Sequence, residues 1–583
     1  MINVFWKGTD SQGSARAQPS NPERLNSHRF VPAPMANAHE RCMMLRSSIT
    51  SDLSTLQPIE QPLALTDSTK PKVERKYVDE IVLGFLSIAA LACWMVLRSH
   101  YGLFANRDNT HFAFEKIPGG FHSETLRQTA GIFILLGLIY FITFWFIRTT
   151  PVLSTLAKLL IGTTILGPAV VNVLLYPIGA LDVFNYMIEL KLNYFYHENP
   201  YLVTFEGFRS DSFALPAFLV NVPLFYGPVW LLLSWLPTVI VGFDSFIRVL
   251  VALKIFNAVM LFGTAILASR FHTDPRKRWL TAFLVLANPL VLFEGIANVH
   301  NDVMMTFFLV AAVLALKKKS VLAGPLLVLA TLVKFYPLAL APLFVVRVFA
   351  DRWGWRKAAL SAGLSVVALI VVVAPYWSGG DMVDGLRDGI DQSQEMDHVS
   401  IFSLAQQFEQ QRVAEDSYNT TFLKTLSSSD VLTEATRSNL RDGFALVFIV
   451  FAAGIALSTL RGRSMELAAV ETLLLFLLLQ TNLYPWYLIP IFALVAVQLD
   501  RIGLIYLFFA SALGLFYYPM YVYGHFNSGW ERFHVHLFLA LFLTAPVVLY
   551  LAARPLLFVW NIAASRVKPA ITQRRSVSLP ASQ

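Results

Sequence analysis

The run from Ala130 to Ile147 decides the fold class; it reads AGIFILLGLIYFITFWFI, with no charged residue and no regular polar/apolar alternation. A helix needs about 20 such residues to cross the ~30 Å hydrocarbon core of a bilayer. Similar runs recur along the chain, which is 56% hydrophobic and 14% charged, with a mean hydropathy of +0.56. Soluble domains are far more polar, and a β-barrel would show alternation. The sequence predicts an all-α polytopic membrane protein.

The apolar runs predict a bundle of about 12–14 transmembrane helices. One further apolar stretch, 228–242, is too short for a full crossing and is interpreted as a half-helix in one leaflet. Asn288-Pro289 and Tyr336-Pro337 are expected to kink their helices, because proline cannot donate a backbone hydrogen bond. The predicted spans lie near 81–97, 130–148, 153–176, 245–270, 279–298, 302–317, 320–335, 336–350, 358–377, 443–460, 465–483, 487–499, 502–522 and 534–557.

Charges in the turns predict the topology. The loop 177–227 holds five acids against Lys191 and Arg209, and the loop 378–442 holds twelve acids against five bases. By the positive-inside rule these loops face outward, and both termini are cytoplasmic. The net charge of +8 then reflects the basic residues of the cytoplasmic turns. The sequence has no basic soluble patch of the kind that binds nucleic acid. The predicted cytoplasmic turns contain Arg276–Arg278, Lys317–Lys319, Arg352 with Arg356 and Lys357, Arg461 with Arg463, Arg501, and the tail from Arg566.

Composition divides the chain into three parts. Residues 1–77 are rich in Ser, Pro, Asn and mixed charge, which predicts a disordered cytoplasmic tail. Residues 78–560 form the predicted transmembrane domain, and 561–583 a basic cytoplasmic tail. Only Cys42 and Cys93 occur, without the spacing of a metal site or a disulfide framework, so redox chemistry is not indicated.

Four polar clusters fall on the predicted outer side, joined by Lys334 at the same level. The first begins at Asp182; on a helix, Asp182, Tyr186 and Glu189 share one face at i, i+4 and i+7. The other clusters are Tyr226-Gly227-Pro228 followed by Arg248, then Glu294 through His300-Asn301-Asp302, and Tyr484-Pro485-Trp486-Tyr487.

Each cluster also has a purely structural interpretation. Tyr and Trp at a membrane interface usually belong to the aromatic belt. Charged groups are harder to explain in this way, because placing each one at membrane depth costs ~2.5–3.5 kcal/mol of insertion free energy. A charged residue at this depth therefore usually has a function. Lys334 and Glu294 can still be structural, each paired with a neighbouring helix, and so can Lys254 and Glu471.

In their order and common side, these motifs resemble the GT-C superfamily of polyprenyl-phosphate-sugar-dependent glycosyltransferases. The spacing is most similar to the bacterial polyprenol-phosphomannose-dependent alpha-mannosyltransferases. The resemblance rests on Asp182 followed by Asn199-Pro200-Tyr201, then Tyr226-Gly227-Pro228, His300-Asn301-Asp302, and Lys334 with Pro337. It covers roughly residues 130–350 by motif and extends to about 560 by topology.

The resemblance implies a GT-C-like bundle with outer juxtamembrane helices in a bacterial cytoplasmic membrane. It implies inverting transfer of a sugar, mannose by this resemblance alone, from a polyprenyl-phosphate carrier to a glycan or glycolipid acceptor at the outer face. The family's catalytic base is an acid of the first outer loop, and Asp182 matches it. Its carboxylate suits removal of the acceptor's hydroxyl proton.

Chemistry suggests further roles around this base. Arg248 and Lys334 are candidates to stabilise the leaving phosphate, because cationic donors suit developing negative charge. His300 is expected to donate to the phosphate or a sugar hydroxyl, beside Asn301, and Asp302 to orient His300 or assist in positioning. The expected site wall consists of Tyr186, Glu189, Tyr226, Tyr484, Trp486 and Tyr487.

The sequence departs from the superfamily in one respect and leaves two alternatives open. Many members carry paired acids in the first loop, whereas Leu181 and Val183 flank Asp182, so a divalent metal is possible but not indicated. Glu189 is a candidate second acid, and the loop 378–442 a candidate acceptor-binding cap.

A transporter should show internal repeats, which are not evident. An outer-face glycan ligase or polymerase should carry paired arginines on its large loop, where arginines here are scattered.

Overall fold

The computed structural model describes residues 72–106, 122–150, 153–393, 400–401, 429–480, 483–526 and 534–554. Helix α2 begins at Lys72, inside the predicted tail 1–77, of which residues 1–71 lie outside the described ranges. The predicted basic tail 561–583 also lies outside them. The described residues form helices joined by turns and loops, with one isolated antiparallel bridge between Gly102 and Leu175.

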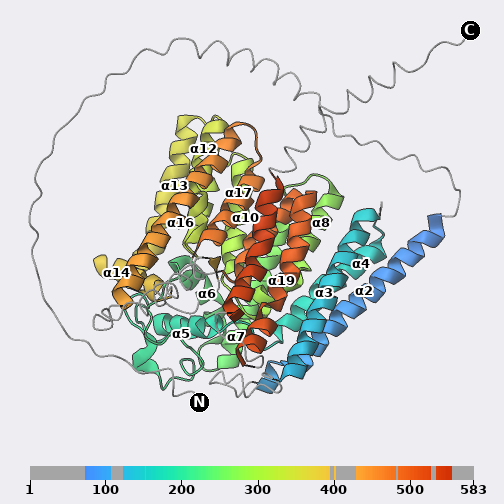
Figure 1. Ribbon diagram of the computed structural model, residues 1–583, viewed down its shortest axis with the longest axis horizontal. Helices are drawn as coiled ribbons and strands as arrows, with labels where there is room; N and C mark the ends of the chain where they lie inside the picture. Colours follow the sequence, from blue (N-terminus) through green and yellow to red (C-terminus); the bar gives the residue numbers. More distant parts are fainter. Residues whose placement is uncertain are drawn as a thin grey trace, which may run out of the picture. The chain divides into compact units, whose positions relative to one another are not determined.

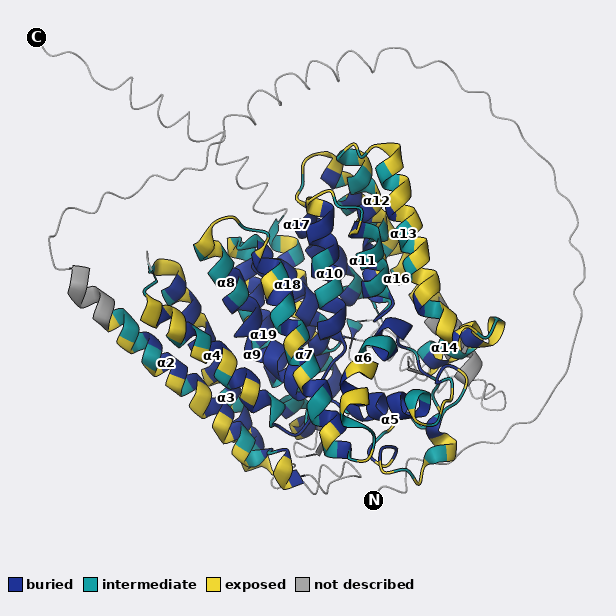
Figure 2. Ribbon diagram, turned by 180° about the vertical axis from the view of Figure 1, so that it is seen from behind, coloured by how far each residue is buried: buried dark blue, intermediate teal, exposed yellow. Residues whose placement is uncertain are grey.

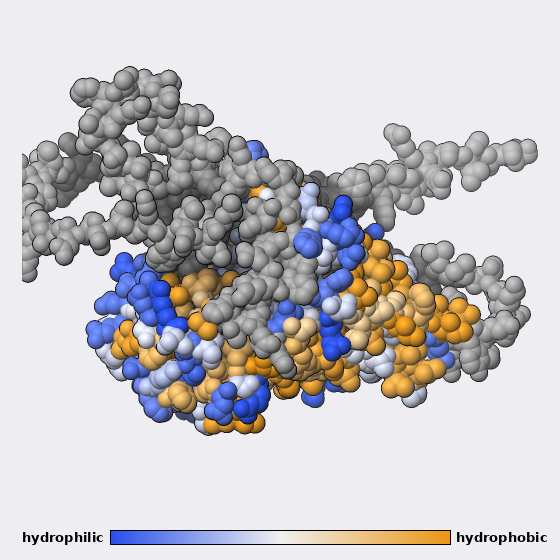
Figure 3. All heavy atoms as spheres, turned by 90° about the horizontal axis from the view of Figure 1, so that it is seen from below, coloured by the Kyte–Doolittle hydropathy of each residue, from blue (hydrophilic) through white to orange (hydrophobic). Residues whose placement is uncertain are grey.

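Eight helices in the described part of the chain are long and apolar enough to cross a membrane. Their outer faces are apolar too: Ile81, Phe85 and Ile88 of the first helix are each 71% exposed. Figure 3 shows hydrophobic residues over much of the surface seen from below. This confirms the all-α multi-pass membrane fold. The eight belong to α2 (Lys72–His100), α3 (Ser123–Thr149), α4 (Thr155–Val173), α7 (Phe246–Ser269), α13 (Trp355–Val373), α16 (Ser429–Leu460), α19 (Arg501–Phe526) and a final helix at His534–Arg554.

A further apolar segment is broken in the middle. Helix α8 (Pro275–Leu286) is followed by α9 (Pro289–Leu292) and by a π-helical turn, η5 (Phe293–Ala297), with a bend of 51°. The bend lies at Asn288-Pro289, as expected from the sequence. The Asn288 side chain caps the second part by accepting from the backbone N–H groups of Leu290 and Val291, at 3.0 and 3.3 Å. The break therefore has its own hydrogen-bond partners within the bundle.

Five of the fourteen predicted spans are shorter than a full crossing. Helix α10, with 16 residues, is ~24 Å long, below the ~30 Å of the hydrocarbon core. Proline or polar residues end the others early. The five are α10 (Asp302–Lys317), α11 (Ala323–Thr331), η6 (Tyr336–Leu340) with α12 (Ala341–Ala350), α17 (Met465–Leu479), and η9 (Pro485–Leu488) with α18 (Ile489–Gln498). Helices α10, α17 and α18 are mostly buried, and Figure 2 shows dark blue along α10 and α17. Most residues of α11 and α12 are intermediate or exposed.

The loop 177–227 contains one α-helix and leads into a second, and both position the candidate site. Helix α5 (Asp182–Tyr194) lies crosswise to the upright helices (Figure 1). Helix α6 (Pro228–Val241), with 14 residues, confirms the predicted half-helix. Helix α14 (Gly380–Ser393) begins the loop 378–442, and its Gly389 lies against the carbonyl of Pro223 in the loop 177–227. The short helices η2 (Phe104–Asn106), η4 (Phe205–Phe208) and η7 (Ala374–Tyr376) complete the described elements.

The basic turns contact one another at one end of the bundle. Lys317 pairs with Glu466 at 2.6 Å, and Lys319 donates to the carbonyl of Asp351 at 3.2 Å. Arg276 donates to the carbonyl of Arg148 at the end of α3. Figure 1 shows α12 and α8 toward this end and α5 toward the opposite one. The turns with the positive charges and the acidic first loop therefore lie at opposite ends.

Candidate functional site

Asp182 is the first residue of α5 and faces the interior of the bundle. Its side chain is 17% exposed, with Oδ2 3.5 Å from the Tyr226 hydroxyl and 3.6 Å from Nδ1 of His300. Burial raises the pKa of Asp182 to about 6, although the positive charge of Lys334 opposes the rise. At pH 7 the group is mostly ionised, with an accessible oxygen and only loose partners. Such a carboxylate can accept a proton.

His300 lies between two carboxyl groups. Its Nδ1 faces Asp182, and its Nε2 is 3.3 Å from Oε2 of Glu294. The ring stacks on Trp486, with centroids 4.0 Å apart and an interplanar angle of 14°. Burial lowers the pKa of His300 well below its usual range, so the imidazole is neutral at pH 7. The ring is thus fixed in orientation, and one nitrogen is directed at the candidate base.

A second acid, Asp302, is fully buried and tightly held. Its Oδ2 accepts from the Lys334 ammonium at 2.7 Å, and its Oδ1 accepts from the Tyr336 hydroxyl at 3.0 Å. The expectation that Asp302 orients His300 is not what the structure shows, because the acids beside His300 are Asp182 and Glu294. Asp302 instead positions Lys334, whose ammonium also lies 4.5 Å from the centre of the Tyr487 ring.

The half-helix α6 begins beside this pair. The backbone N–H of Gly227 donates to the carbonyl of Val333, and that of Val229 donates to the carbonyl of Leu332, at 3.1 and 3.0 Å. A Cβ on Gly227 would overlap the Leu332 backbone, so glycine is required for this close approach. The contact places Tyr226 between Asp182 and Lys334, whose ammonium lies 5.7 Å from the ring centre.

Aromatic rings line the two sides of the cluster. Trp486 stacks on Tyr484 at 4.5 Å between centroids, extending the His300 stack. On the α5 side, Tyr186 contacts Tyr226 and Trp230 with centroids 5.2 and 4.8 Å away. The predicted wall residues from three distant segments are therefore brought together around Asp182.

Glu189 and Asn301 are also buried here. Burial and the nearby charge of Asp182 raise the pKa of Glu189 to about 8, which keeps its carboxyl mostly protonated at pH 7. It is therefore poorly suited to act as a second base. The Asn301 side chain is 1% exposed, and neither its oxygen nor its nitrogen has a hydrogen-bond partner among the described residues. Such a group is available to a ligand.

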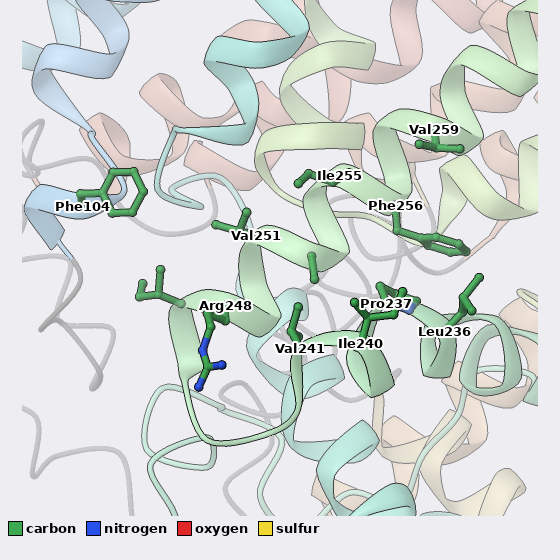
Figure 4. A pocket seen from close by; sticks show the side chains of 12 residues that line it. Phe104, Leu236, Pro237, Ile240, Val241, Arg248, Val251, Ile255, Phe256 and Val259 are labelled. Carbon is green, nitrogen blue, oxygen red and sulfur yellow. The ribbon is translucent and has the colours of Figure 1, made fainter.

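Arg248 does not join this buried cluster. Its side chain is 55% exposed, and its charged partner is Asp244 at 3.7 Å. It lines an apolar groove of ≈620 Å³ between α6 and α7, closed on one side by Phe104. Figure 4 shows its guanidinium extending away from Val251 and the other apolar side chains. The sequence grouped Arg248 with Lys334, but the structure separates them.

Sequence reasoning missed several residues that hold the site together. Lys254 donates to the carbonyls of Ile296 and Ala297, and Asn257 donates to those of Gly295 and His300 at 2.9 and 3.0 Å. These side-chain donors hold the carbonyls of the π-helical turn and of His300 in place. A lysine and an asparagine three residues apart inside an apolar span are the signal that could have indicated this role. The sequence suggests a structural ion pair for Lys254, but its partners are backbone carbonyls. Glu471, for which the sequence suggests the same, does pair with Arg463.

Two further contacts connect the loops. Asn298 accepts from the backbone N–H of Gly179 at 3.2 Å and donates to Glu294 at 3.0 Å, which ties the turn to the segment preceding Asp182. The Tyr201 hydroxyl donates to the carbonyl of Tyr226 at 2.8 Å. Among the described residues, no group of three or more His, Cys, Asp or Glu side chains is arranged to hold a metal ion.

Part of the chain matches a known protein family. Residues 81–351 match the family model described as the N-terminal domain of alpha-(1->6)-mannopyranosyltransferase. The matched segment runs from α2 through α12 and includes Asp182, His300, Asp302 and Lys334, whereas Trp486 lies beyond it. A search of curated proteins finds no match. Because the matched family consists of alpha-mannosyltransferases, this multi-pass membrane protein is a glycosyltransferase of the mannosyltransferase class.

Proposed function

We propose that the protein transfers mannose, with inversion at the anomeric carbon, from a polyprenyl-phosphate carrier to a hydroxyl of a glycan or glycolipid. The observation that carries the proposal is Asp182: a mostly ionised carboxylate with loose partners, at the start of a helix that lies across the bundle. The reaction takes place at the outer face of a bacterial cytoplasmic membrane, with both termini inside. The gathering of basic turns at the opposite end supports this orientation.

Asp182 removes the proton from the acceptor hydroxyl as its oxygen attacks the anomeric carbon. The bond between that carbon and the phosphate oxygen breaks, and the electron pair remains on the lipid phosphate. A base on the opposite side from the leaving group gives inversion. The His300 ring, 3.6 Å from Asp182 Oδ2, keeps the carboxylate directed into the site.

Lys334 stabilises the phosphate as its charge develops. An ammonium has three N–H donors, and Asp302 occupies one at 2.7 Å, which leaves donors for the phosphate. Asn301 and His300 bind sugar or phosphate oxygens, and the stacked Tyr484 and Trp486 rings form the wall beside the sugar. The apolar groove along α6 and α7 suits the hydrocarbon tail of the carrier, with Arg248 near its phosphate during entry.

The test is transfer by membranes that contain the wild-type chain or Asp182→Asn, supplied with radiolabelled polyprenyl-phosphate mannose. The variant removes the base and keeps the shape, so we expect a loss of about 10²- to 10⁴-fold at equal protein level. Glu206→Gln, the same carboxylate-to-amide change at a side chain that is 58% exposed, is the matched control and should retain activity. Full activity in Asp182→Asn would refute the assignment of the base. Absence of transfer from any polyprenyl-phosphate sugar by the wild type would refute the donor class.

A further inference from the structure

An apolar cleft of ≈810 Å³ lies between α3 and α19, apart from the residues of the candidate site. Phe508 forms its floor, with ring centroids 5.2 Å from Phe141 and 5.1 Å from Phe144. Trp145 and Ile505, 56% and 63% exposed, form its rim. The volume is within the roughly 300–1,000 Å³ of ligand sites.

One end of the cleft is cationic. Arg148 in the last turn of α3 and Arg501 at the start of α19 both line it, and both are exposed. Neither is in an ion pair with another described residue. Asp500, the acid next to Arg501, forms an ion pair with Arg554 at 2.9 Å. Arg276 adds a third guanidinium by donating to the carbonyl of Arg148. The cleft therefore ends in positive charge without a neutralising carboxylate from the described chain.

The dimensions match a lipid within one leaflet. Ile134 and Arg148 line the same cleft 14 residues apart on α3, which corresponds to ~21 Å along the helix axis. Half of the ~30 Å hydrocarbon core is about 15 Å, so the apolar part can hold an acyl chain while the arginines reach the phosphate level. Anionic lipids attract basic residues at this level, whereas zwitterionic lipids have no net charge to do so.

We propose that the α3/α19 cleft is a binding site for an anionic glycerophospholipid of the leaflet at the basic end of the bundle, with its phosphate on Arg148 and Arg501 and an acyl chain against Phe508. This site lies at the end opposite α5. It is independent of the proposed transfer reaction and requires only that α3 and α19 span the membrane.

Trp145 at the rim provides a direct probe. The full chain is placed in nanodiscs that contain phosphatidylglycerol or phosphatidylcholine with brominated acyl chains, which quench a nearby tryptophan. Because the chain has 12 tryptophans, the fluorescence of Trp145 is obtained as the difference between the wild type and Trp145→Phe. We expect half-maximal quenching at about a tenfold lower fraction of brominated phosphatidylglycerol than of brominated phosphatidylcholine.

The role of the arginines is tested by substituting them both in the wild-type chain and in Trp145→Phe. Arg148→Ala/Arg501→Ala should abolish the preference, and Arg148→Lys/Arg501→Lys should retain part of it. Arg352→Ala/Arg356→Ala, two exposed arginines in another basic turn, is the matched control and should leave the preference intact. Equal quenching of wild type by the two lipids would overturn the proposal, as would an unchanged preference in the double alanine variant. Displacement of phosphatidylglycerol by polyprenyl phosphate at equimolar amounts would assign the cleft to a different lipid and also overturn it.

Discussion

Asp182 and Asp302 are both aspartates at the start of a helix, yet their surroundings differ. Asp302 is fully buried, with both oxygens in bonds of 2.7–3.0 Å to Lys334 and Tyr336. Asp182 is partly exposed and has contacts of 3.5–3.6 Å. A buried acid that is fully paired stabilises its neighbours, whereas a loosely held one keeps an oxygen for a substrate. This difference is the reason why we propose positioning for Asp302 and proton acceptance for Asp182.

The largest effect on stability is expected at Asp302. Asp302→Asn removes the counter-charge and leaves the Lys334 ammonium buried without compensation, which should cost about 3–5 kcal/mol of unfolding free energy. Thermal unfolding in detergent measures the loss. The double variant Asp302→Asn/Lys334→Met removes both charges and should recover much of it. If the double variant is as unstable as the single one, the pair does not have the role assigned to it.

The pH dependence tests the other side of the comparison. A base must be unprotonated, and the pKa of Asp182 is about 6, so kcat/KM should be level above pH 7 and fall about tenfold per unit well below pH 6. The measurement is the rate at low donor concentration between pH 5 and 8. The control variant Glu206→Gln should show the same profile. A constant rate down to pH 5 contradicts proton acceptance by Asp182.

The smallest expected effect is that of Asp182→Asn on stability. The folded-state pKa is raised from 3.8 to about 6, so protonation favours the folded state. Relative to the variant, the wild type should therefore gain stability as the pH falls from about 6 to 4, and at pH 7 it should be no more stable than the variant. Thermal unfolding of both proteins at pH 7 and pH 4.5 measures this difference. Marked destabilisation of the variant at pH 7 would make Asp182 a structural acid like Asp302.

The sequence predicts the helices better than it predicts which side chains pair with one another. The isolated stretch 228–242 identified α6 closely, because hydropathy and proline positions act locally. The helix assumed for Asp182, Tyr186 and Glu189 is α5. Residues from all four predicted polar clusters lie close together around Asp182. Partner choice depends on helix rotation and on bends that hydropathy does not encode. The sequence therefore does not show that Asp302 pairs with Lys334, 32 residues away, or that Arg248 lies apart from both; the structure shows both facts.

The docking of α6 onto residues 332–333 has a consequence for biosynthesis. Two backbone N–H groups of the half-helix, at Gly227 and Val229, find their acceptors more than 100 residues later in the chain, at Val333 and Leu332. A ribosome delivers the half-helix well before those carbonyls enter the membrane. Asp182, Tyr226 and Lys334 can therefore come together only after α11 has been inserted, so the pocket is completed late in assembly and a nascent chain that stops before α11 has no working site.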